Sequence, residues 1–240
     1  MKRIGLIDYY LDEWHANNYP GWIRDNAKAS SRCCEVAYAW AEIDRPGGID
    51  TLNWCKNHNV HALSSIEELV EKSDYIIVLS PDNPEHHERL GHLPFQSGKP
   101  VYMDKTFSPD LASGRRMFEQ AETYRTPLFS SSALRFAKEL SNYPNAEVNR
   151  ETLEYLATMG PGTYKNYSVH QYEIIVSLLG PGARQIKSLS SEHGQLLVIE
   201  YDDGRQASFC QMENAPFQLN IQLNNGNGVG YLNVPICLLV

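Results

Sequence analysis

Short apolar runs alternate with stretches of helical length through the first half of the chain, and this pattern constrains the fold more than any other feature. The runs lie at residues 4–7, 36–41, 75–79, 100–103 and 127–129. Apolar runs without polar alternation are typical of strands that are covered on both faces, as in a parallel sheet. Because strands that alternate with helices indicate βαβ units, we expect an α/β fold in which residues 1–125 form a doubly wound parallel sheet.

Two of the intervening stretches carry helix signals of their own. Ser65 is followed three residues later by Glu68, which is the pattern of a capping box at a helix N-terminus. The segment 110–124 follows Pro109 and has apolar residues at near-helical spacing. Both stretches are therefore predicted to be helices.

The chain changes character after about residue 140. Segments typical of strands lie at 151–157, 196–201, 206–211, 217–223 and 231–234. The segment 217–223 alternates apolar and polar residues, so one of its faces is expected to be wet. Alternation of this kind indicates an antiparallel sheet. Residues 126–240 are therefore predicted to form a smaller α+β domain with an open, largely antiparallel sheet.

The connections in this second half support the same interpretation. Turn residues at 202–205 and 224–228 indicate hairpins between consecutive strands. One helix is expected at 169–179, and it should end before Gly180-Pro181, which cannot continue it.

The composition is that of an ordinary globular protein. Of the 240 residues, 42% are hydrophobic and 21% are charged, which argues against disorder. The formal net charge of −8 argues against a general binder of nucleic acid or anionic membranes. The five cysteines include no CxxC pair, which favours a reducing, cytoplasmic location.

Targeting and metal signals are weak. The apolar run after Arg3 is too short for a signal peptide, and no run of about 18 apolar residues predicts a membrane span. We expect no metal, because metal-ligand spacing is not found at His58, His61, His92 and His193.

The turn after the first strand lacks the glycines that a dinucleotide site uses to approach the pyrophosphate. Residues 8–15 contain instead Asp8, Asp12 and Glu13 together with aromatic side chains. These carboxylates would repel a pyrophosphate, so the turn by itself argues against ordinary NAD binding. Three interpretations remain open: a loop that only caps the first strand, a rebuilt ligand site, or a cofactor held by other contacts.

Five segments resemble one known family in their order and spacing. They lie at 65–69, at 73–81, followed by a histidine pair, and at 97–106, 128–136 and 166–173. Together they resemble the Gfo/Idh/MocA family, which includes relatives of glucose–fructose oxidoreductase and inositol dehydrogenase. Asp104-Lys105-Thr106 stands where that family has Glu-Lys-Pro. The resemblance covers about residues 3–234 and implies a Rossmann-like first domain.

The resemblance implies hydride transfer between a nicotinamide and a hydroxyl carbon of a sugar or polyol. Lys105 matches the lysine that polarises the reacting oxygen, a role that suits lysine chemistry. His170 matches the histidine that serves as general acid or base. Asn166 stands one helical turn earlier, where an aspartate is frequent. It shares a face with His170 and could orient a substrate, but it could not take a proton.

The resemblance also implies binding residues. The cofactor would be NAD or NADP, although the glycine fingerprint is absent, and an acidic residue past the second strand, Glu42 or Asp44, could bind its ribose. Substrate contacts are expected from Arg135, Tyr167 and Glu173. Cofactor contacts are expected from Asp8, Tyr9, Tyr10, Glu42, Ser80, Pro81, His87, Asp104 and Lys105.

Each candidate also has a purely structural explanation. Lys105 could be a solvated surface group, His170 a satisfied core histidine and Asn166 a helix N-cap. His86 and His87 could line a cofactor cleft or lie on the surface where a helix begins.

Three functions are therefore expected, in this order. The first is an NAD(P)-dependent oxidoreductase acting on a sugar, polyol or related small molecule. The alternative is a non-catalytic relative that binds a ligand or mediates assembly and has lost the dinucleotide phosphate loop. The third is a lyase or hydrolase that uses Lys105 and His170 without redox change. The resemblance further implies a homodimer or homotetramer formed through the C-terminal sheet. The chain is short for the family, so the second domain is expected to be trimmed or cut short.

Overall fold

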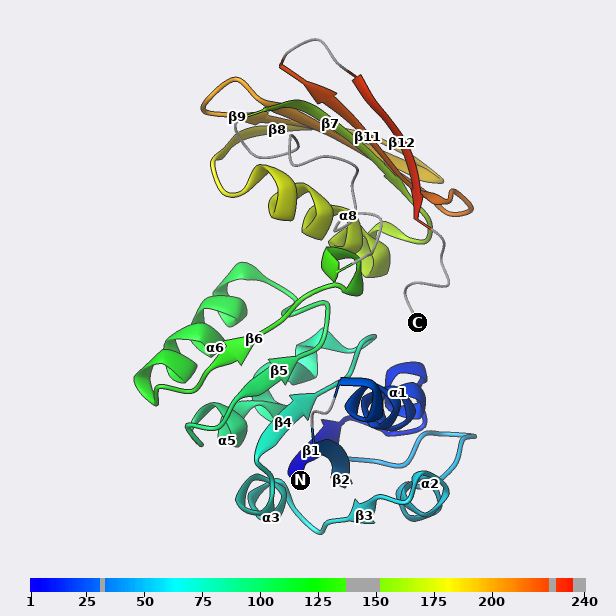
Figure 1. The fold of residues 1–240 in the computed structure, drawn as a ribbon, viewed down its shortest axis with the longest axis vertical. Helices are drawn as coiled ribbons and strands as arrows, with labels where there is room; N and C mark the ends of the chain where they lie inside the picture. Colours follow the sequence, from blue (N-terminus) through cyan, green and yellow to red (C-terminus); the bar gives the residue numbers. More distant parts are fainter. Residues whose placement is uncertain (31–32, 137–151, 225–227, 235–240) are drawn as a thin grey trace. The chain divides into compact units, whose positions relative to one another are not determined.

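A computed structural model describes residues 1–30, 33–136, 152–224 and 228–234. The chain divides into two compact units, Met1–Ser131 and Ser132–Val240, each built around its own sheet (Figure 1). The first unit extends past residue 125, where the sequence prediction placed the boundary, because the strand at 128–129 pairs with the first sheet.

The first unit contains a six-stranded sheet in the order β3-β2-β1-β4-β5-β6. All of its neighbouring strands are parallel, so the predicted doubly wound parallel sheet is confirmed. The strand β3 has only two residues, too few to give a sequence pattern. The strands are β1 (Lys2–Asp8), β2 (Cys34–Ala41), β3 (His61–Ala62), β4 (Tyr75–Val78), β5 (Val101–Met103) and β6 (Leu128–Phe129).

Helices connect these strands. The sequence analysis did not predict α1, because Pro20 and a polar Asn17-Asn18 pair interrupt its apolar periodicity. The helices are α1 (Trp14–Ser30), α2 (Thr51–His58), α3 (Ile66–Lys72), α4 (His87–Leu90), α5 (His92–Phe95) and α6 (Leu111–Thr123), with a 3₁₀ turn η1 (Pro84–His86).

The two predicted helix starts are confirmed. Ser65 caps α3, since its hydroxyl accepts a hydrogen bond from the backbone N–H of Glu68 at 3.2 Å. The Glu68 carboxylate reaches back to the backbone N–H of Ser64 at 3.1 Å, one residue earlier than an ordinary capping box. Asp110 caps α6 by accepting from the backbone N–H of Ser113 at 2.8 Å.

The two faces of the first sheet bury separate cores. Leu6 packs with Trp54 of α2, whereas Ile7 packs with Leu69 of α3. Adjacent residues of β1 thus point to opposite, equally covered faces, as expected for a doubly wound sheet. Gly5 allows α3 to approach closely, because a Cβ there would lie 2.4 Å from the Ser73 hydroxyl and 2.5 Å from a Leu69 methyl.

The second unit contains a mixed six-stranded sheet in the order β12-β11-β7-β10-β9-β8. Only β10 and β7 are parallel among its described neighbours, and the other pairs are antiparallel. The α+β architecture with a largely antiparallel sheet is therefore confirmed. The elements are η2 (Ala133–Phe136), β7 (Leu153–Gly160), α8 (Tyr164–Leu179), β8 (Ala183–Ser191), β9 (Gly194–Tyr201), β10 (Gln206–Met212), β11 (Phe217–Leu223) and β12 (Gly228–Val234).

The core of this unit lies between α8 and one face of the sheet. Phe217, Leu219, Ile221 and Leu223 are buried on alternate positions of β11, so the predicted one-sided strand is confirmed. They cluster with Ile175 and other α8 side chains.

Several boundaries differ from the sequence prediction. The helix α8 begins at Tyr164 rather than 169, because polar residues fill its first turn. The strand β8 was not predicted, and all of its residues are exposed. Residue 151 of the first predicted strand and residues 225–227 of the predicted turn lie outside the described residues. Within the described part of the chain, no helix has both the length and the apolar character of a membrane span.

Candidate functional site

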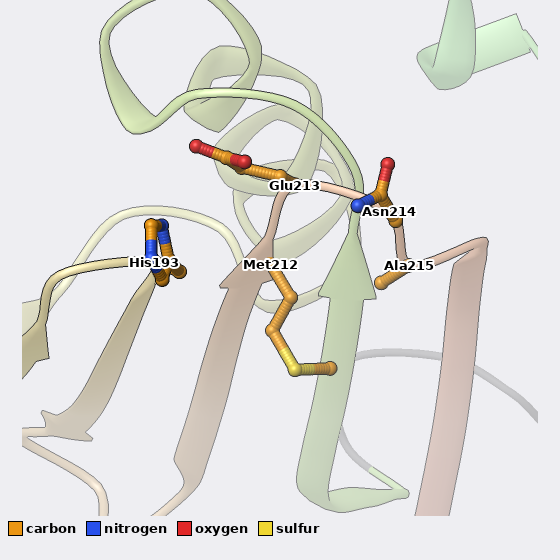
Figure 2. A pocket seen from close by; sticks show the side chains of 5 residues that line it. All are labelled: His193, Met212, Glu213, Asn214 and Ala215. Carbon is orange, nitrogen blue, oxygen red and sulfur yellow. The ribbon is translucent and has the colours of Figure 1, made fainter.

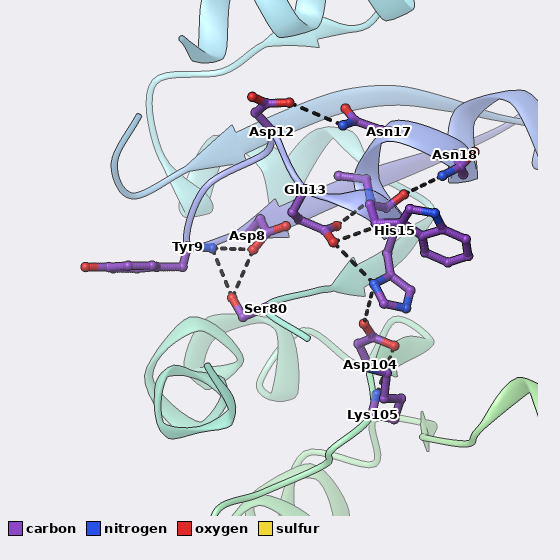
Figure 3. A network of polar contacts seen from close by, with 12 residues as sticks. Asp8, Tyr9, Asp12, Glu13, His15, Asn17, Asn18, Ser80, Asp104 and Lys105 are labelled. Carbon is purple, nitrogen blue, oxygen red and sulfur yellow. Dashed lines mark hydrogen bonds and ion pairs between the residues drawn. The ribbon is translucent and has the colours of Figure 1, made fainter. Parts of the chain in front are cut away.

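Asp8 lies at the carboxyl end of β1, the edge at which doubly wound sheets bind ligands. Its buried Oδ1 accepts hydrogen bonds from the backbone N–H of Tyr9 at 2.6 Å and from the Ser80 hydroxyl at 3.0 Å. Ser80 follows β4 and has a φ of 78°, a left-handed conformation that is uncommon outside glycine. The structure thus brings together Asp8, Tyr9 and Ser80 at the ends of two neighbouring strands (Figure 3).

Glu13 occupies the N-terminus of α1. Its Oε2 accepts from the backbone N–H of His15 at 2.8 Å and lies 3.2 Å from Nδ1 of the same residue. Its Oε1 accepts from the backbone N–H of Ala16. These amides, with the positive end of the helix dipole, are the groups that bind phosphate in a dinucleotide site. Here the side chain of the protein itself fills that position (Figure 3).

Asp104 completes a buried acidic cluster with Asp8 and Glu13. It follows β5, is 1% exposed, and its Oδ1 accepts from the backbone N–H of Lys105 at 2.9 Å. Its Oδ2 lies 3.7 Å from Nδ1 of His15. His15 thus stands between the carboxylates of Glu13 and Asp104 (Figure 3).

Burial in the acidic cluster shifts the pKa of Asp8 and of Asp104. Burial, and then the charge of Glu13, raise the pKa of Asp8 well above its usual range. Burial also raises the pKa of Asp104, although His15 and Lys105 oppose the shift. In the described structure Asp8 Oδ2 and Asp104 Oδ2 are buried without a hydrogen-bond partner. A protonated carboxyl is less costly to bury in this state than a carboxylate.

Two further predicted cofactor residues lie against arginines. Glu42 forms an ion pair with Arg89. The ring of Tyr10 lies beneath the guanidinium of Arg45 at 5.6 Å. A ribose hydroxyl that bound Glu42 would have to compete with the existing ion pair.

Pro81 lies in the turn that follows β4, and His87 is the first residue of α4. His87 is fully buried, and its Nδ1 lies 3.0 Å from the backbone carbonyl of Phe107. Burial lowers the pKa of His87, so the imidazole is neutral and resembles a core histidine. Pro81 directly follows Ser80 and is half-buried.

The described residues do not fit a dinucleotide pyrophosphate at the β1–α1 turn. Glu13 already satisfies the amides of the first turn of α1. A pyrophosphate at this position would therefore have to displace the Glu13 carboxylate, and ionisation of Asp8 or Asp104 would add like-charge repulsion.

His170 is the central polar side chain of the second unit. It lies on α8, is 5% exposed, and its Nδ1 lies 2.7 Å from Oγ of Ser132. The rings of Tyr167 and Phe217 lie 5.5 Å and 5.7 Å from the imidazole. The hydrogen bond with Ser132 and the two aromatic neighbours thus help to hold the imidazole.

Asn166 and Tyr167 lie in the first turns of α8. Thr163 is the N-cap of this helix, so the interpretation of Asn166 as an N-cap is wrong. Asn166 is half-buried one turn before His170, and Tyr167 is 39% exposed.

The predicted substrate residues Arg135 and Glu173 bind each other. Nε of Arg135 donates to Oε1 of Glu173 in a partly exposed ion pair. Oε2 of Glu173 also accepts from the backbone N–H of Ser132 at 3.4 Å. Both side chains therefore fasten the start of η2 to α8.

Sequence reasoning missed three residues of these arrangements. Glu13 was recognised only as a charge, and His15 was not singled out, because the helix that begins at this turn was not predicted. Ser132 had no signal, because its partner lies 38 residues away.

Pockets that contain none of the predicted site residues also lie on the described surface. One lies at the end of the second sheet, between the β8–β9 turn and the residues that follow β10, and is lined by His193, Met212, Glu213, Asn214 and Ala215 (Figure 2). Another is an apolar pocket on β4, β5 and β6 and includes Tyr75 and Phe129. Among the described residues, no group of three or more His, Cys, Asp or Glu side chains is arranged to hold a metal ion.

Comparisons with known proteins detect similarity in structure and not in sequence. No protein-family model matches the chain, and no curated protein matches it. The chain is similar to the UDP-N-acetylglucosamine 3-dehydrogenase GnnA from Acidithiobacillus ferrooxidans, with a TM-score of 0.72 and 12% identity over 92% of this chain and 71% of that one.

Two further solved structures are similar to the same extent. The dehydrogenase MviM from Clostridium difficile has a TM-score of 0.73 and 14% identity over 98% of this chain and 84% of that one. The WlbA dehydrogenase from Chromobacterium violaceum, solved with NADH and UDP-GlcNAcA, has a TM-score of 0.72 and 14% identity over 92% of this chain and 71% of that one. At these identities the comparison confirms the two-domain dehydrogenase fold that the Gfo/Idh/MocA resemblance implies.

Proposed function

We propose that the chain is an oxidoreductase that acts on a hydroxyl carbon of a sugar, polyol or related small molecule, with His170 moving the hydroxyl proton. The observation that carries this proposal is the buried hydrogen bond between Ser132 and His170, which holds the imidazole in one orientation. Histidine suits the role because its side chain ordinarily titrates near neutral pH. The similar folds of several dehydrogenases support the reaction class.

Lys105 has the second proposed role, the polarisation of the reacting oxygen. It follows β5 at the ligand-binding edge of the first sheet. Its backbone N–H donates to the buried Asp104 carboxyl, and this hydrogen bond holds the backbone of Lys105 in place. A lysine ammonium can donate a hydrogen bond to an oxygen that gains negative charge.

The proposed hydride acceptor is a nicotinamide cofactor. NAD or NADP is the acceptor that the structural neighbours suggest, since one of them was solved with NADH. The β1–α1 turn does not fit its pyrophosphate while Glu13 caps α1. The proposed roles of His170 and Lys105 concern the substrate hydroxyl alone.

A second candidate is a ligand-binding relative that carries out no hydride transfer. Glu13 favours it, because its carboxylate takes the place of the anion at α1. Such a protein would still bind a sugar or polyol.

The deciding experiment is a titration of the full chain with NADH and NADPH by fluorescence, followed by an assay of sugars and polyols with NAD⁺ and NADP⁺. An oxidoreductase should bind one nicotinamide and reduce it with at least one substrate. Lys105→Ala and His170→Ala should each lower kcat by about 10²-fold or more. The exposed controls Lys187→Ala and His193→Ala should keep full activity.

The outcomes separate the two candidates. If neither cofactor binds at roughly millimolar concentration and none is reduced, the oxidoreductase proposal fails. Binding of a sugar or polyol without reduction would then support the second candidate. Unchanged turnover in both site variants would remove Lys105 and His170 from the reaction.

A further inference from the structure

Ser132 meets two side chains of α8 that lie three residues apart. Its hydroxyl is 2.7 Å from Nδ1 of His170, and its backbone N–H donates to Glu173 at 3.4 Å. Residues three apart on a helix face the same side. Ser132 therefore contacts one face of α8 through both its backbone N–H and its hydroxyl.

The hydroxyl of Ser132 has limited hydrogen-bonding capacity. A serine hydroxyl has one proton to donate and two lone pairs to accept with. One lone pair accepts the backbone N–H of Leu134 at 3.1 Å. The other can accept the Nδ1–H of His170 in the fully buried contact between them.

We propose that Ser132 is a positioning residue that holds His170 in the tautomer with the proton on Nδ1. In this tautomer Nε2 carries no proton, so it is the ring nitrogen that would accept a proton from the substrate. When Nε2 takes that proton, Nδ1–H continues to donate to Ser132, so neither side chain has to rotate. This inference rests on the proposed function, in which His170 moves the hydroxyl proton.

The surroundings of the pair favour a fixed ring. Tyr167 and Phe217 flank the imidazole at 5.5 Å and 5.7 Å. The ion pair between Arg135 and Glu173 holds the segment that carries Ser132 against α8. The hydroxyl and the ring are thus placed by independent contacts, which limits the freedom of the hydrogen bond between them.

The tautomer can be measured without turnover. In the full chain labelled with ¹⁵N-histidine, long-range proton–nitrogen spectra distinguish Nδ1–H from Nε2–H, and His170→Gln identifies the signals of His170. The wild type should show Nδ1–H for His170 at neutral and higher pH. Ser132→Ala should shift the signal toward Nε2–H, the tautomer that histidine prefers in water. Ser132→Thr keeps the hydroxyl and should restore Nδ1–H.

Kinetics provide the second readout. Ser132→Ala should lower kcat about tenfold with KM within about twofold, because one hydrogen bond to the acting group is lost. Ser177→Ala is the matched control, since its hydroxyl bonds only locally to the Ile174 carbonyl on α8, and it should change neither quantity. If Ser132→Ala does not fold, Ser132→Cys, with a weak donor and acceptor, takes its place.

The two proposals can fail separately. A wild-type Nε2–H signal, or an Nδ1–H signal that persists in Ser132→Ala, overturns the role of Ser132 whatever the activity. The expected tautomers in a protein without any oxidoreductase activity would leave the Ser132 contact standing and refute the proposed function.

Discussion

Replacement of Glu13 by glycine should open an anion site at the N-terminus of α1. In the wild type the Glu13 carboxylate satisfies the backbone amides of His15 and Ala16 and contacts the His15 ring. Glu13→Gly removes this carboxylate and leaves the amides free to bind another anion. The variant should therefore bind pyrophosphate, whereas the wild type should not.

The magnitude follows from two opposing effects. Replacement of the capping carboxylate by glycine should cost only roughly a few tenths of a kcal/mol of unfolding free energy, partly offset because Asp8 and Asp104 lose a like-charged neighbour. A pyrophosphate present at about 100 times its Kd would return about 2.7 kcal/mol. Added pyrophosphate should therefore reverse the loss in the variant.

The assay is urea denaturation of the full chain with and without pyrophosphate, with NADH as a second ligand. Glu13→Gln is the matched control, because its amide oxygen can still cap α1 and fill the position. It should show no stabilisation by pyrophosphate. Equal stabilisation of the wild type and Glu13→Gly would refute the idea that Glu13 occupies the anion position.

Two further predictions concern the first unit. Asp8→Asn should become more stable relative to the wild type as pH rises. The raised pKa of Asp8 gives the wild type stability that is present below about pH 4 and is lost as pH rises through the folded pKa. Urea midpoints at a series of pH values would show this, and parallel curves for the two proteins would contradict it. Gly5→Ala should lower the free energy of unfolding by about 1–3 kcal/mol, because the new Cβ would lie 2.4 Å from the Ser73 hydroxyl. Calorimetric melting should show the loss, and an unchanged melting temperature would mean that α3 lies farther from β1.

The sequence determined the class of the fold and the place of most of its strands along the chain. Apolar runs such as 75–79 and the alternation at 217–223 report burial directly, because burial on one or two faces fixes the residue types that a strand can carry. The cap at Ser65 was also readable, since its partner lies within four residues. The absence of glycine after β1 left three interpretations of that turn open.

Only the tertiary structure decided what replaces the phosphate loop and how His170 is held. The contacts of Asp8 with Ser80 and of His170 with Ser132 join residues 72 and 38 positions apart. Residue type alone cannot predict such pairs, because they depend on which strand ends and helix faces meet when the chain folds. The sequence identified Glu13 as a charge, but its place on the amides of α1 became visible only once the helix itself, concealed by Pro20 and polar residues, was located.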